Sequence, residues 1–257
     1  MGKGLQFNAS YTFSKSIDYN SQSSQGVTVQ DSYNLRGDRG LSDFDARHRF
    51  VVSGLYELPF KGNQLKEGWQ LSLIEQSQSG NPVTLLAGNA GAIGTTIPAA
   101  NANSLTGLAT LRPDINGPLT ISPTAAASGI GVQWFPKLVC DPRPGGSCPS
   151  SSVVVLPVQF INGKSVYHFG SLGRNVVIGP GFNNTDLSLI KRTKLSERQM
   201  IEFRWEVFDV FNHANFGQPG RTAQVGSTTF GVITNTRFPT GDSGSSRQMQ
   251  FALKYKF

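Results

Sequence analysis

The chain opens with a strict alternation of apolar and polar side chains. The odd-numbered positions from Leu5 to Phe13 are apolar or aromatic, and the even-numbered positions from Gln6 to Ser14 are polar and uncharged. A period of two predicts a β-strand with one apolar face and one polar face. A sheet with lipid on one side and water on the other needs such strands. A soluble β-sandwich also contains them, so one strand does not decide between the two.

The same alternation closes the chain. One face of the last segment is apolar and consists of Met249, Phe251, Leu253, Tyr255 and Phe257. The residues between them include Lys254 and Lys256, which we expect at the lumen or the periplasmic rim. The ends of soluble domains usually fray into solvent. This ending resembles the last strand of bacterial outer-membrane barrels, so we expect the five apolar residues to form the signal that the barrel assembly machinery recognises.

Four further segments alternate in a similar way. The six expected strands lie near residues 4–15, 46–60, 68–79, 184–192, 199–211 and 247–257. We expect their aromatic side chains to face lipid, namely Phe7, Tyr11, Phe13, Phe203, Trp205, Phe251 and Tyr255. We expect the charged side chains of segment 199–211 to face the lumen, namely Glu202, Arg204 and Glu206, where opposite charges can pair across strands.

Segment 199–211 also fits a helix. Its apolar residues Met200, Phe203 and Val207 fall on one helical face, and Ser196 with Gln199 resembles a capping box. The enrichment in aromatic and β-branched residues favours the strand.

The lengths of the connections give the segments an orientation. Two connections are short, from residue 60 to 69 and from 189 to 201, whereas three are long and rich in Gly, Pro, Asn, Ser and Thr, namely 14–45, 80–183 and 212–246. Short and long connections alternate strictly, as in transmembrane barrels with short periplasmic turns and long extracellular loops. About eleven residues at roughly 3.3 Å each, tilted by about 40°, span an apolar band of about 25 Å. The pattern therefore predicts an all-β fold, an antiparallel up-and-down transmembrane β-barrel segment with a large extracellular loop over residues 81–183.

Six strands do not close a bacterial barrel, for which about eight are the minimum. An open sheet in lipid leaves edge amides without partners, at several kcal/mol per group. We therefore expect this chain to be the carboxyl-terminal part of a larger barrel. Alternatively, the region from Val153 to Phe160 supplies two more strands.

Composition supports a strand-based membrane protein. Charged residues make up only 15% of the 257 residues, Gly is abundant at 29, and no run of 18 apolar residues occurs. The formal net charge of +7 raises the question of a polyanionic partner, but the basic residues are scattered and show no nucleic-acid-binding spacing. We therefore expect no nucleic acid among the partners.

The two cysteines, Cys140 and Cys148, flank a short stretch rich in Pro and Gly. A disulfide between them would stabilise that loop by roughly 2 to 3 kcal/mol and would indicate an oxidising compartment. Two free thiols are the alternative.

Signals for catalysis and metal binding are weak. The segment Gly241–Ser245 imitates a serine-protease nucleophile motif with His48 upstream, but too few residues follow it to complete such a domain. The three histidines are far apart, and the aspartates of the first long loop (Asp31, Asp38, Asp43 and Asp45) lack EF-hand spacing and are expected to be solvated. We expect no enzyme activity, no catalytic residue, no cofactor and no metal.

Three motifs carry a family resemblance. They are DFDARHRF at 43–50 with YELPF at 56–60, LGRN at 172–175 with GPGFNNTDLS at 179–188, and FDVFNHANFG at 208–217. In this order they resemble the carboxyl-terminal barrel of TonB-dependent outer-membrane transporters, specifically the Oar-like receptors. Asp209 stands where Asn is commoner in the third motif.

The resemblance implies a fold and a set of partners. It implies a barrel of about 22 strands that takes up a large or scarce substrate when TonB pulls on a plug. The plug and the TonB box are not present in this chain, so we expect it to supply barrel wall and surface loops and not to transport alone. The implied partners are outer-membrane lipid, the barrel assembly machinery, the upstream strands and the plug, with TonB reached only through the plug. The alternatives are a small passive outer-membrane barrel and a secreted β-sandwich that serves as a binding or adhesion module.

Overall fold

The structure, a computed structural model, describes residues 4–21, 29–88, 111–127, 129, 131–237 and 246–257. The described chain is all-β and contains no α-helix, only the short 3₁₀-helix η1 (Leu35–Asp38). No helix in these residues is long and apolar enough to cross a membrane. The all-β prediction is confirmed.

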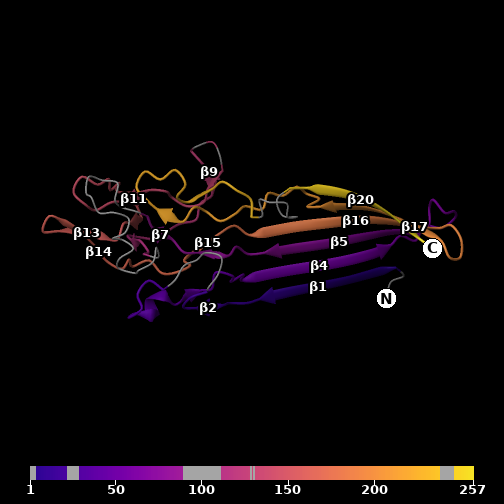
Figure 1. Ribbon diagram of the computed structural model, residues 1–257, viewed down its shortest axis with the longest axis horizontal. Helices are drawn as coiled ribbons and strands as arrows, with labels where there is room; N and C mark the ends of the chain where they lie inside the picture. The colour runs from indigo at the N-terminus through magenta and orange to yellow at the C-terminus, as the bar shows by residue number, and fades with distance from the viewer. Residues whose placement is uncertain (1–3, 22–28, 89–110, 128, 130, 238–245) are drawn as a thin grey trace.

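Six long strands form one antiparallel sheet. They are β1 (Leu5–Phe13), β4 (His48–Glu57), β5 (Trp69–Gln78), β16 (Phe182–Lys194), β17 (Met200–Phe208) and β20 (Gln248–Lys256). Their order in the sheet, β1-β4-β5-β16-β17-β20, follows the order along the chain, as expected of an up-and-down arrangement (Figure 1). Five of the strands lie within the predicted segments, whereas β16 extends beyond 184–192 at both ends. The helical alternative for residues 199–211 is wrong, because β17 is a strand.

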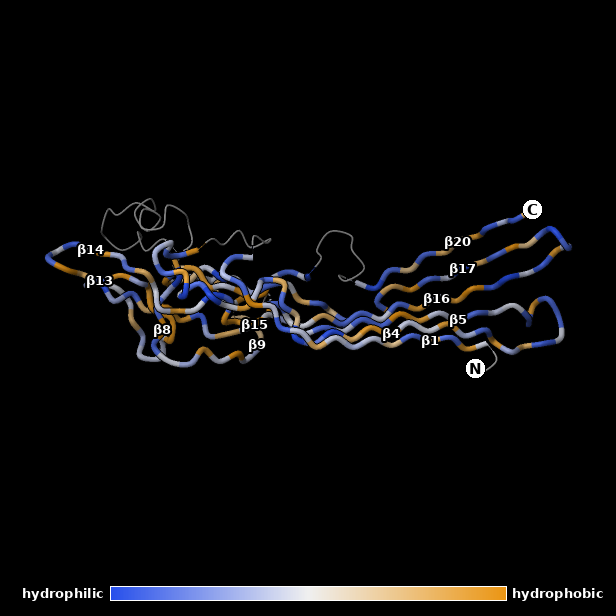
Figure 2. Tube along the Cα trace, turned by 90° about the horizontal axis from the view of Figure 1, so that it is seen from below, coloured by the Kyte–Doolittle hydropathy of each residue, from blue (hydrophilic) through white to orange (hydrophobic). Residues whose placement is uncertain are grey.

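The strand register aligns the apolar faces across the whole sheet. One row of paired residues is apolar in every strand and contains Leu5, Tyr56, Leu71, Leu189, Trp205 and Phe251. The next row on the same face, two residues further along each strand, contains Phe7, Gly54, Leu73, Leu187, Val207 and Met249. Because side chains alternate between faces, a slip of one residue in any strand would carry its apolar set to the other face. Figure 2 shows the resulting alternation of hydrophobic and hydrophilic positions along the strands.

β1 begins and β20 ends at the same end of the sheet, on its two opposite edges, and the long connections fold at the other end (Figures 1 and 2). The turns between β4 and β5 and between β16 and β17 are short. The loop end has a hydrophobic core of its own, which consists of Val83, Leu85, Phe135, Val139, Val154, Leu156, Val158, Leu172, Val177, Ala223 and Phe230. We call this folded part the loop layer.

Short strands organise the loop layer. They are β2 (Ile17–Asp18), β3 (Gly40–Leu41), β6 (Pro82–Val83), β7 (Leu86–Ala87), β8 (Asp114–Ile115), β9 (Thr124–Ala125), β10 (Val132–Gln133), β11 (Val139–Cys140), β12 (Val154–Val155), β13 (Val158–Ile161), β14 (Lys164–Tyr167), β15 (Val177–Ile178), β18 (Thr222–Ala223) and β19 (Val232–Ile233). The region Val153–Phe160 falls in β12 and β13, which pair with β8, β11 and β14 and not with the main sheet. It therefore supplies no further wall strand.

The main sheet is open. Within the described residues, β1 pairs only with β4 and β20 pairs only with β17, so each has one edge without a strand beside it.

Candidate functional site

A cleft lies where the polar face of the sheet meets the loop layer. Its wall includes Thr12, Arg49 and Gln78, which are direct neighbours in one row across β1, β4 and β5. Loop residues close the other sides, among them Phe44 and Phe216. The volume is about 800 Å³, which lies within the usual range for small-molecule sites.

Arg237 spans one side of this cleft. Its Nη2 donates to Asn81 Oδ1 at 2.7 Å, and its guanidinium lies 5.4 Å from the ring centroid of Phe182. Burial lowers the pKa of Arg237 from its ordinary value, because a low-dielectric surrounding disfavours the charged form. These contacts hold the side chain in place beside the row of Arg49 and Gln78.

The three motifs that carried the family resemblance meet around this cleft. The first and second motifs join where Asn175 Nδ2 donates to Asp43 Oδ1 at 2.6 Å. The second and third join where the Asn215 side chain accepts from the backbone N–H of Asn183 and donates to its carbonyl, both at 2.8 Å. The motifs therefore fix the junction between the wall and the loop layer.

Buried arginines connect the first long loop to the large loop. The Arg174 guanidinium hydrogen bonds to Asp18, and Arg112 hydrogen bonds to Asp38. Burial would raise the pKa of Asp18, but hydrogen bonds from Ser21, Ser42 and Arg174 and the charge of Arg174 outweigh it and hold this pKa below 3.8.

The expectation of solvated aspartates is therefore wrong for three of the four, since the side chain of Asp43 is also only 7% exposed and lies 3.6 Å from Arg174. Asp38 is 0% exposed and Asp45 is 4% exposed. Asp38 is paired with a buried arginine, and Asp45 Oδ1 accepts from the backbone N–H of Ser16 at 2.6 Å. The large loop covers Asp38, a contact between distant segments that local sequence does not show.

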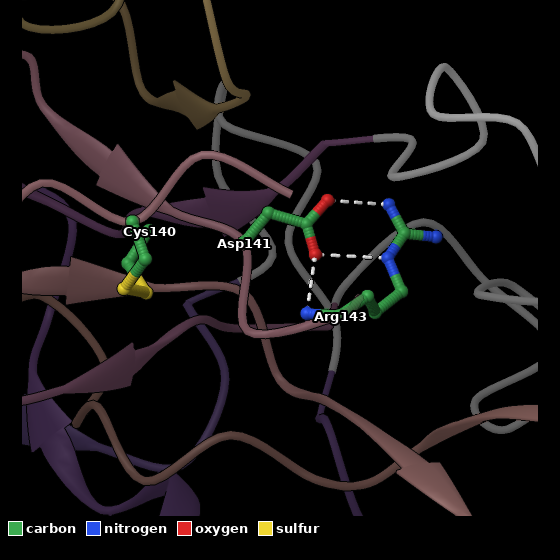
Figure 3. The surroundings of a disulfide bond; sticks show 4 residues. Cys140, Asp141 and Arg143 are labelled. Atoms are coloured by element: carbon green, nitrogen blue, oxygen red, sulfur yellow. Dashed lines mark hydrogen bonds and ion pairs between the residues drawn. A yellow bond between two sulfur atoms is a disulfide. The ribbon is translucent and has the colours of Figure 1, made fainter. Parts of the chain in front are cut away.

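The cysteines form a disulfide in the loop layer, across eight positions of sequence. Beside it, the Asp141 carboxylate accepts two hydrogen bonds from the Arg143 guanidinium, at 2.9 and 2.6 Å, and one from its backbone N–H at 3.1 Å (Figure 3). Burial would raise the pKa of Asp141, but these bonds and the charge of Arg143 outweigh it and lower the pKa.

The predicted lumen-facing charges form a network on the polar face. Glu202 Oε2 accepts from Arg192 Nε across the strands, and Glu202 Oε1 accepts from Arg204 Nε, both at 2.9 Å. Lys256 Nζ lies 3.8 Å from Glu202, and Arg204 lies 3.9 Å from Glu206. The Glu202 side chain is only 3% exposed beneath these cations.

The predicted lipid-facing aromatics lie on the opposite face. Exposure is 75% for Phe7, 61% for Tyr11, 64% for Phe13, 68% for Phe251 and 51% for Tyr255. Phe203 and Trp205 are partly exposed and stack on Phe251, with ring centroids 6.3 and 6.4 Å apart. None of the seven packs into the core of the loop layer. The five residues proposed as the terminal assembly signal lie on β20 and just after it, and all are exposed.

The structure adds no support for the weak sequence signals of catalysis and metal binding. His48 lies on β4, where its Nδ1 is 2.8 Å from the Tyr11 hydroxyl, and residues 241–245 lie outside the described part of the chain. Over the described ranges, no three His, Cys, Asp or Glu side chains form a group that could hold a metal ion.

Comparison with known proteins identifies the family. A model of the outer membrane beta barrel domain matches residues 1–250. The chain belongs to this family. As a member of it, the chain forms barrel wall in the bacterial outer membrane. Searches of curated proteins and of solved structures found no significant match.

Membership in the outer membrane beta barrel family indicates what surrounds each face of the sheet. In an outer-membrane barrel the apolar face meets lipid and the polar face meets the lumen. The cleft lies on the polar face, at the end of the strands where the long loops fold. Sequence reasoning missed Arg49 and Gln78 as site residues, although both occupy polar-face positions of their strands.

Proposed function

We propose that this chain is the carboxyl-terminal barrel wall and the surface loops of a TonB-dependent, Oar-like outer-membrane transporter for a large or scarce substrate. In this proposal it has no catalytic role. Its partners are outer-membrane lipid, the barrel assembly machinery, further wall strands and a plug, through which it reaches TonB.

The open sheet carries the proposal. The outer edges of β1 and β20 have no neighbouring strand within the described residues. Unpaired backbone groups in hydrocarbon are too unfavourable to persist, so these edges need further strands. A wider barrel has room for a plug, whereas a barrel of about eight strands is filled by its own side chains. The three motifs around the cleft, which resemble those of Oar-like receptors, support the same proposal.

The test compares energised with passive uptake. The gene is deleted in its own bacterium, and uptake of iron chelates, cobalamin, peptides and oligosaccharides is measured with and without a protonophore. We expect one class to depend on the gene and its uptake to stop with the protonophore, because TonB draws on the proton gradient. Gene-dependent uptake that persists with the protonophore would contradict the proposal and support a passive barrel.

A further inference from the structure

We infer that the cleft between the polar face and the loop layer binds the anionic group, a carboxylate or a phosphate, of a saccharide-sized solute. The inference rests on the proposed function, because a transporter needs a substrate site at the mouth of its lumen. The lining residues used below all lie in the described part of the chain.

Charge is the first argument. Arg49 is exposed at the cleft, and its guanidinium makes no hydrogen bond or ion pair with any other residue in the described ranges. Arg237 adds a second guanidinium to the lining. The carboxylate that also lines the cleft, Asp43, already accepts from Asn175 and lies 3.6 Å from Arg174. Cationic groups are therefore left in excess, and a guanidinium binds a carboxylate or phosphate in a bidentate manner.

The remaining lining favours a hydrogen-bonding solute over a bare inorganic ion. Gln78, Asn81 and Gln218 contribute side-chain amides, and Thr12 contributes a hydroxyl. Phe44 and Phe216, which are 63% and 38% exposed, add apolar surface. A cleft of about 800 Å³ is much larger than a phosphate ion needs. Amides beside exposed rings suit a solute with several hydroxyl groups and a flat apolar side.

Strand pairing holds the backbone of the cleft-lining residues on the sheet in fixed positions before a ligand binds. Thr12, Arg49 and Gln78 project from three adjacent strands whose pairing fixes their spacing. Phe182 continues the row on β16 and lies under the Arg237 guanidinium. A site on paired strands loses little backbone freedom when a ligand binds.

The experiment measures binding by calorimetry with the full-length protein in detergent. The probes are trigalacturonic acid for carboxylates, glucose 6-phosphate for phosphates, and maltotriose as the neutral saccharide. We expect at least one anionic probe to bind about tenfold or more tightly than maltotriose, and this affinity to weaken with salt. Equal affinity for neutral and anionic probes, or no binding, would overturn the inference.

Variants locate the site. We expect R49Q to weaken anion binding about tenfold or more, because a charge-assisted hydrogen bond is lost. Q78E should weaken it as well, since it places a negative charge next to Arg49 in the row. R198Q removes an exposed arginine from the β16–β17 turn and should leave binding unchanged. Heat-modifiable gel mobility checks that each variant is folded, and an unchanged dissociation constant in both R49Q and Q78E refutes the site.

Failure of this inference is distinguishable from failure of the proposed function. Binding in detergent needs neither TonB nor a proton gradient. Absent binding with protonophore-sensitive uptake would overturn the anion site alone. Anion binding with protonophore-insensitive uptake would overturn the TonB-dependent function alone.

Discussion

The buried pair of Arg112 and Asp38 provides a sharp test of how the loop layer is held together. The two side chains are 3% and 1% exposed. Besides the bond to Asp38, Arg112 donates from Nη2 to the Gly37 carbonyl at 3.0 Å and from Nε to the Leu172 carbonyl at 2.8 Å. The substitution R112M removes all three bonds and keeps a side chain of similar length, but it leaves a buried carboxylate without its cation.

Removing one partner of a buried ion pair costs about 3 to 5 kcal/mol. At about 1.4 kcal/mol for each factor of ten, the loop layer should open roughly 100 to 4,000 times more often. Limited proteolysis on intact cells measures this opening when cleavage is slow relative to reclosing. We expect faster cleavage of the loops in R112M, with the membrane-embedded sheet still heat-modifiable.

Two further variants make the prediction specific. The double variant R112M/D38N contains no unpaired charge, so it should be cleaved more slowly than R112M. R198Q, in the turn between β16 and β17, should be cleaved like the wild type. If R112M is cleaved no faster than R198Q, the pair does not hold the two loops together and the reasoning is refuted.

Three other predictions concern the sheet, the disulfide and acid. L73K places a charge on the proposed lipid face and should destabilise the inserted barrel by about 2 to 4 kcal/mol near the membrane midplane. The amount of heat-modifiable protein in membranes should therefore decrease, whereas S72K, on the proposed lumen face, should not reduce it. Equal yields of the two variants would contradict the assignment of faces. Replacing Cys140 and Cys148 by Ser should destabilise the loop layer by about 2 to 3 kcal/mol, and unchanged proteolysis would contradict this. Because the pKa of Asp18 lies below its ordinary value of 3.8, its stabilising contribution is complete above about pH 4 and is lost as the pH falls further. Hydrogen exchange of the loops, corrected for intrinsic rates, should show this loss in the wild type and not in D18N, and identical profiles would exclude it.

The alternation of the sequence was sufficient to predict the wall. A strand has a side-chain period of two, and lipid on one side with water on the other imposes that period on every membrane strand. The aromatic face of β1 and the apolar face of β20 could therefore be located one residue at a time. The short connections indicated which strands are neighbours, because a short turn can only join antiparallel strands that lie side by side. β16 was predicted too short, since Thr193 and Lys194 give no apolar signal at its end.

The loop layer and the cleft could not be predicted in this way. Arg112 and Asp38 are 74 positions apart, and each alone has the composition of a solvated loop. The cleft likewise combines Arg49 from β4 with Arg237 from a loop far along the chain. Local sequence determined which side chains share a face of each strand, because side chains alternate between the two faces of a strand. Which distant polar groups pair, and where they leave a cationic cleft, was decided only by tertiary structure, because it depends on how the long loops fold over the end of the sheet.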